Sequence, residues 1–165
     1  MLKRRNRVDL IGIKLQPKHF PTLFLFGVLY GFFFVNYADL RVTSSFHLWL
    51  ILCYFAPFIP LLLLSRLKYW KEVLTLGLLS SLMNDLFYAE AAILFLGHEI
   101  NLIEWYKWQF GFYWTDAKWN FSGGFFTFPV TSILMGASIY ARIATILILL
   151  IKRRKNYLSQ TEKDT

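Results

Sequence analysis

The chain is poor in the residue types on which disulfide-rich domains and metalloproteins depend. Its 165 residues include one cysteine, Cys53, three histidines and ten acidic residues. A single cysteine excludes an internal disulfide and a cysteine-based metal cluster. Also missing are a nucleophile elbow, an HExxH helix, a dinucleotide fingerprint and the paired-carboxylate motif of a known hydrolase. No motif therefore points to a soluble enzyme, and none implies a cofactor.

Apolar residues, in contrast, are abundant. They make up 56% of the chain and include 17 Phe, and the mean hydropathy is +0.44. This composition is typical of membrane proteins. The net charge of +8 comes from 18 Lys and Arg that stand in short clusters beside the apolar runs. We therefore expect the basic clusters to contact the lipid bilayer and not nucleic acid.

Four apolar runs are long enough to cross the core of a bilayer. They predict an all-α integral membrane protein, a four-helix transmembrane bundle with spans at about 20–38, 46–64, 73–97 and 129–151. Pro21 and Pro129 fit the first turns of two of these helices, because the N–H that proline lacks has no partner there. Pro57 and Pro60 predict a kink in the second helix.

Glycines in the first span have a spacing that favours close helix packing. Gly27 and Gly31 form a GxxxG pair, which lets the backbone of a second helix approach closely. In the fourth span a similar face is formed by Gly136, Ala137, Ser138 and Ala141. Both faces are candidates for helix contacts, within the chain or with a partner.

The remaining segments define the domain boundaries. Residues 1–18 form a basic cytoplasmic or interfacial arm, 19–155 form the membrane domain, and 156–165 are expected to be a polar, disordered tail. The outer loop, 100–128, lies between the third and fourth helices and is rich in Trp, Tyr and Phe. Such a loop lies at a membrane interface, as an aromatic belt or as a short helix on the membrane.

The cations also predict an orientation. They concentrate in the 1–18 arm, in the 66–71 loop and at 152–155, whereas the opposite loops hold only Arg41, Lys107 and Lys118. Four spans place the three cationic segments on one side. The positive-inside rule then predicts a multi-pass protein with both termini in the cytoplasm.

Polar residues inside the third and fourth spans form the predicted centre of the protein. At 1.5 Å per residue, Asp85 and Arg142 lie about 18 and 15 Å from the cytoplasmic ends of their helices, near the middle of the bilayer. We therefore expect them to pair. At 100° per residue, Asn84 and Tyr88 lie on the same face of the third helix, and Asp85 lies at the edge of that face. Glu90 points away, toward a separate neighbour or a protonated state.

Two interpretations of this polar centre stay open. A buried ion pair can fix the register of two helices without any chemistry. Alternatively, the centre is a functional site. Asp85, Glu90 and Asn84 are more polar residues than one ion pair between two helices requires, and ionisable residues in membrane spans usually mark sites for protons, ions or polar headgroups. The second interpretation is ranked slightly higher.

Histidines mark the outer rim. His47 begins the second span and His98 ends the third, next to Glu99. Two imidazoles with nearby carboxylates are suitable ligands for a metal or haem, although no spacing motif links them. The preferred interpretation is that the polar imidazole rings of these histidines lie among the lipid headgroups and bind no metal. Asn120 begins a glycosylation sequon in the outer loop.

Three functions from different classes follow from this pattern. We rank first a transport- or channel-type component in which Asn84, Asp85, Glu90 and Arg142 form a mid-membrane site. Four spans make a small pathway, so a homo-oligomer or a larger membrane complex is expected. The first alternative is an accessory or assembly subunit with a structural Asp85–Arg142 pair. The second is a membrane-embedded enzyme for a lipid or isoprenoid, with His98 and outer acids as acid–base groups.

Overall fold

The computed structural model describes residues 19–41, 48–122 and 126–161. The predictions for the 1–18 arm and for His47 lie outside these residues. Two helices are long and apolar enough to cross a membrane, Phe20–Arg41 and Ser132–Lys155, and a third, bent pair can form another span. The protein is thus mostly helical and suited to a membrane.

The first helix is continuous but changes its winding in the middle. It comprises α1 (Phe20–Leu29), the π-helical η2 (Tyr30–Val35) and α2 (Asn36–Arg41). Pro21 lies in the first turn of α1, as predicted. Asn36 donates from Nδ2 to the carbonyl of Phe32 at 3.1 Å. This bond satisfies a backbone carbonyl in the wider π turn, where the i to i−4 ladder is interrupted.

The second apolar run is broken by its prolines. It comprises α3 (Leu48–Phe55), the 3₁₀ turn η3 (Ala56–Phe58) and α4 (Ile59–Leu64). The helix changes to a 3₁₀ turn that contains Pro57, and Pro60 follows it. The kink itself stays a prediction. The apolar helical stretch Trp49–Leu64 is shorter than the roughly 20 residues of a typical span.

The third run is not the single straight helix that we predicted over 73–97. It consists of α5 (Trp70–Leu86) and α6 (Tyr88–Leu96), which are bent by 63°. Gln109 donates from its side-chain amide to the carbonyl of Asp85. The bend removes that carbonyl from the helical ladder, so the side chain of a later helix replaces the lost bond.

The aromatic outer segment folds into a cap of a short helix and a hairpin. We predicted either an aromatic belt or a short helix for this segment, and the helix is present as α7 (Leu102–Gln109). Asn101 caps its N-terminus, where the Asn101 side chain accepts from the N–H of Glu104 at 3.3 Å. Strands β1 (Ala117–Ser122) and β2 (Thr127–Thr131) pair antiparallel. This hairpin is an exception to the all-α prediction.

The hairpin also corrects the start of the last helix. Pro129 lies in β2 opposite Asn120, so it does not open a helix. A two-stranded ribbon tolerates proline because both strands are edges. Helix α8 (Ser132–Thr161) begins after the hairpin and continues into the segment for which we expected a disordered tail. No Gly or Pro interrupts the sequence between Lys152 and Thr161.

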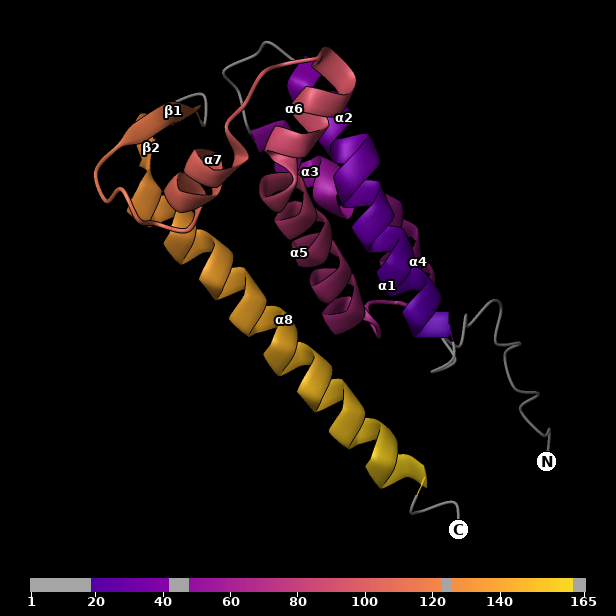
Figure 1. The fold of residues 1–165 in the computed structure, drawn as a ribbon. Coiled ribbons are helices and arrows are strands. Elements are labelled where there is room, and N and C mark those ends of the chain that lie inside the picture. Colours follow the sequence, from indigo (N-terminus) through magenta and orange to yellow (C-terminus); the bar gives the residue numbers. More distant parts are fainter. Residues whose placement is uncertain (1–18, 42–47, 123–125, 162–165) are drawn as a thin grey trace, which may run out of the picture.

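Helix α5 occupies the centre of the molecule. It packs against α1, η2, α3 and α8. Figure 1 shows α7 and the hairpin at the same end as α2 and α6, whereas α8 slants away and its C-terminal end lies at the opposite end. At that opposite end Arg153 lies 4.0 Å from Glu72 and 4.0 Å from the centre of the Phe20 ring. Two of the cationic segments, 66–71 and 152–155, are therefore at one end of the bundle.

Candidate functional site

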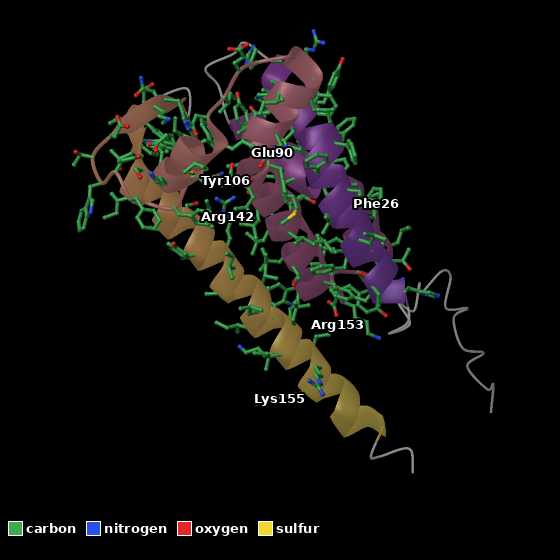
Figure 2. The ribbon with its side chains drawn as sticks, viewed as in Figure 1. Phe26, Glu90, Tyr106, Arg142, Arg153 and Lys155 are labelled. Atoms are coloured by element: carbon green, nitrogen blue, oxygen red, sulfur yellow. The ribbon has the colours of Figure 1, made fainter. Side chains whose placement is uncertain are left out.

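The predicted ion pair between α5 and α8 is present. Arg142 forms a salt bridge with Asp85, and it also donates to Ser81 Oγ at 2.7 Å and to Ser138 Oγ at 3.1 Å. The side chains of Arg142 and Asp85 are only 12% and 21% exposed. Figure 2 shows Arg142 between α8 and α5. Because both charges are mostly buried, every polar group around the pair affects its stability.

Asn84, one residue before Asp85, joins three helices. Its Oδ1 accepts from the Tyr54 hydroxyl on α3 at 2.8 Å, and its Nδ2 donates to Asn36 Oδ1 on α2 at 2.8 Å. Nδ2 also lies 3.4 Å from Asp39 Oδ2. These partners were not predicted from the sequence, although Asn36 is a polar residue inside the first apolar run. A buried network of this kind restricts the helices to one arrangement.

Tyr88 and Glu90 lie on α6, beyond the bend, and contact different residues of α7. Tyr88 stacks on Trp105, with ring centres 5.6 Å apart. Glu90 accepts a hydrogen bond from the Tyr106 hydroxyl, and both are labelled side by side in Figure 2. Glu90 Oε2 is buried without a hydrogen-bond partner among the residues described. Burial and Glu90 together raise the pKa of Tyr106. Glu90 therefore has a separate neighbour, as predicted, and belongs to the α6–α7 interface.

A cavity of about 670 Å³ extends from the ion pair toward the cap. Its inner wall is polar and consists of Tyr54, Ser81, Asn84, Asp85, Ser138 and Arg142. Aromatic side chains of the cap line its outer end, namely Trp105, Trp119, Phe121 and Phe128. Asp39, Tyr88 and Lys118 also line it. The volume is within the range of small-molecule sites, and an apolar wall with convergent polar groups is typical of them.

The outer-rim candidates are not part of this cavity. His98 and Glu99 are exposed and follow Gly97, whose positive φ of 68° ends α6. Neither residue lines the cavity. Within the described part of the chain, no group of three or more His, Cys, Asp or Glu side chains is placed to hold a metal. Asn120 lies on β1 and is exposed.

The surface of the cap holds a second, exposed charged cluster. Glu104 on α7 accepts from the Tyr113 hydroxyl and lies 2.9 Å from Lys107 Nζ. These two contacts lower the pKa of Glu104 below its ordinary value, and Glu104 in turn raises the pKa values of Lys107 and Tyr113. The cluster fastens the turn after α7 to the helix and so helps to shape the cap.

Lys118 connects the cap to the mouth of the cavity. Its ammonium lies 5.4 Å from the ring centre of Trp105 and 5.7 Å from that of Trp108. Trp108 is fully buried and donates from Nε1 to the Asp116 carbonyl at 2.7 Å. A cation over two indole rings is attracted by their negative faces. This contact holds the hairpin against α7.

Comparisons with protein-family models, curated proteins and solved structures found no match to the chain. The interpretation of the site consequently depends on its geometry and chemistry alone.

Proposed function

We propose that the chain is a small multi-pass membrane protein of the transport or channel type, whose site is the cavity at the Asp85–Arg142 pair. The observation that carries this proposal is the cavity itself, which reaches from the aromatic cap to an ion pair deep between two apolar helices. Ionisable groups at such depth are rare and usually mark a pathway or a binding site. Glu90 lies outside the cavity, so the proposed site is Asn84, Asp85, Arg142 and their hydrogen-bonded neighbours.

In this proposal the chain crosses the membrane four times with both termini in the cytoplasm. Support comes from the broken second run, α3–η3–α4, which packs on α5 beside the two long helices. The 66–71 and 152–155 clusters gather at one end, as Arg153 beside Glu72 and Phe20 shows. Cations on one side indicate the cytoplasmic face.

The two ends of the site differ in a way that favours transport. On the cytoplasmic side of the ion pair, α5 and α8 pack through buried apolar residues that include Leu79, Leu82 and Ile146. On the outer side the cavity lies between these two helices and the aromatic residues of the cap. A site that is accessible from one side and closed on the other is one of the two states that alternating access requires. A homo-oligomer or a larger complex would supply the remaining pathway.

An accessory or assembly subunit is the second candidate. The observation that favours it is that Arg142 donates to Asp85, Ser81 and Ser138, all within the chain. An arginine with this many partners is suited to hold two helices in register. The GxxxG face offers this candidate no support, because Gly27 and Gly31 face α5 of the same chain. An enzyme ranks third, since His98 and Glu99 are outside the cavity.

The test is flux through vesicles that contain the purified protein. One set encloses a pH-reporting dye, and a second set carries a trace of fluorescent phosphatidylcholine whose transfer between leaflets is followed by chemical quenching. We expect one of the two readouts to exceed that of protein-free vesicles. Asp85→Asn should abolish it at equal incorporation, because an amide can still accept a bond from Arg142 but carries no charge.

The matched control is Glu104→Gln, which makes the same change in an exposed carboxylate of the cap. It should leave the flux unchanged. If the wild-type protein gives no flux in either set, or if Asp85→Asn retains it, the transport proposal is wrong. Loss of the Asp85→Asn protein from a detergent-extracted complex, at unchanged folding, would instead support the accessory subunit.

A further inference from the structure

We propose that the ligand of the cavity is a membrane lipid with a polar head group of no net charge, which enters sideways between α3 and α8. This inference rests on the proposed function, since it names the substrate class of the same site. It follows from the position of the cavity between two helices, from the exposure of its side walls and from the balance of its charges.

The two helices that flank the cavity leave a gap between them. Helices α3 and α8 both pack on α5, but within the described residues they share no extensive contact with each other. Leu50 and Ile51 of α3 line one side of the cavity, and Leu134 and Met135 of α8 line the other. The cavity therefore has α5 as its back wall and two apolar side walls.

The exposure of the side walls places an opening on the lipid-facing surface. Ile51 and Leu134 line the cavity and are each 44% exposed. Ser138, one turn along α8 from Leu134, also lines it and is exposed. Leu50 and Met135 line the same cavity but are buried. A molecule that passes Ile51 and Leu134 from the bilayer thus reaches Leu50, Met135 and then the polar wall.

The polarity along α8 matches that of an amphiphile. Leu134, Ser138 and Arg142 lie four residues apart on one face of the helix, so the wall changes from apolar to polar over about 12 Å. An acyl chain gains nothing from a polar wall, and a dissolved ion or sugar gains nothing from an apolar side entrance. A lipid satisfies both, with its head group at Arg142 and its chains between α3 and α8.

The charges of the lining select the class of head group. Two acidic residues, Asp39 and Asp85, and two basic residues, Lys118 and Arg142, line the cavity, so their formal charges cancel. Both members of the deep pair already neutralise each other. A head group with a net charge would leave an uncompensated charge in a desolvated site, whereas a zwitterionic or hydroxyl-bearing head group leaves none.

The experiment uses the full-length protein in lipid nanodiscs that contain a phosphatidylcholine with a diazirine in one acyl chain. After illumination, adducts are located by mass spectrometry. We expect adducts on Leu50 and Met135, which line the cavity but are buried from surrounding lipid. Leu76 is buried elsewhere in the core and should remain unlabelled. Excess unlabelled phosphatidylcholine should reduce the labelling, and phosphatidylglycerol should be about tenfold less effective, a difference of about 1.4 kcal/mol.

Two pairs of variants test the side entrance. Ile51→Trp and Leu134→Trp place a large ring in it from opposite helices, and should each lower labelling of Leu50 and Met135 about tenfold. Their controls are the adjacent residues Leu52→Trp and Ile133→Trp, which are 69% and 44% exposed and do not line the cavity. These should label like the wild type. Two blocking variants from different helices keep the test valid if one fails to fold.

The outcomes separate this inference from the proposed function. Absence of adducts on Leu50 and Met135, equal labelling in blocking and control variants, or equal competition by phosphatidylglycerol would each overturn the inference. Flux that depends on Asp85 without such adducts leaves the transport proposal standing and removes the lipid. Adducts in a protein without flux keep the lipid site and remove transport.

Discussion

Helix α5 has two interfaces of opposite character, one with the first helix and one with α8. Toward the first helix the backbones are in close contact, because a Cβ atom on Gly31 would lie 2.4 Å from the Ser80 carbonyl oxygen. Ser80 Oγ donates to the Gly27 carbonyl at 3.1 Å. Toward α8 the contact at the outer end depends on the long side chain of Arg142, and a cavity lies beside it.

The difference shows how one helix can serve as scaffold and as wall of a site. Small residues bring backbones together and leave no room for a ligand. Long polar side chains hold helices apart, and their charges must be satisfied by fixed neighbours or by a guest. We infer that the interface with the first helix provides rigidity, whereas the interface with α8 provides the site. The following changes test this division.

The largest effect is expected from breaking the ion pair on one side only. Arg142→Gln leaves Asp85 charged and without its cation, which should lower the free energy of unfolding by about 3–5 kcal/mol. The double variant Asp85→Asn with Arg142→Gln should recover most of this loss, because no charge remains buried. The measurement is thermal or denaturant unfolding of the purified protein in detergent.

Arg153→Gln is the control for this pair. Arg153 lies 4.0 Å from Glu72 at the end of the bundle. This pair is long and only partly buried, with side chains 31% and 19% exposed, so we expect a loss of at most about 1 kcal/mol. Equal losses in the single and double variants would show that the pair does not govern stability at the α5–α8 interface.

The next effect concerns the close interface. Gly31→Ala places a methyl group against the backbone of Ser80 and within 2.9 Å of Met83 Cβ, so the helices must separate. We expect a loss of about 1–3 kcal/mol in the free energy of unfolding. Gly27→Ala is the matched variant, because its Cβ would lie 3.5 Å or more from its neighbours, in ordinary contact. Equal unfolding midpoints for the two variants would contradict the tight interface.

The sequence predicted what depends on position along the chain. The equal depths expected for Asp85 and Arg142 predicted that they form a pair. The chemistry of proline predicted that the second helix is irregular at Pro57. Both are one-dimensional properties, fixed by residue type and by the rise of a helix. The aromatic composition of 100–128 predicted an aromatic belt or a short helix, and the short helix is α7.

Features that depend on distant contacts were missed. The bend at Phe87 requires a partner for the freed carbonyl of Asp85, and that partner is Gln109 in a later helix. Pro129 carries the same local signal as Pro21, yet it pairs in a hairpin that its neighbours impose. The cavity results from how α3 and α8 are placed on α5, which no periodicity of a single segment reveals.

A smaller effect is expected at the bend. Gln109→Met keeps the length of the side chain but removes the amide that donates to the carbonyl of Asp85. An unsatisfied buried carbonyl should lower the free energy of unfolding by about 1–2 kcal/mol. Ile103→Met, on the 68%-exposed Ile103 of the same helix, is the control and should have no effect. An unchanged unfolding midpoint for Gln109→Met would mean that another donor replaces the amide.

The smallest effect lies on the surface of the cap, where the charges are screened by water. The Tyr113 hydroxyl and then Lys107 lower the pKa of Glu104 below its ordinary value of 4.5. Because the folded pKa is depressed, the stabilisation by Glu104 is present at neutral pH and is lost as the pH falls through the folded pKa. An NMR titration of the glutamate carboxyls should give Glu104 a pKa below 4.5 in the wild type and closer to 4.5 in Tyr113→Phe.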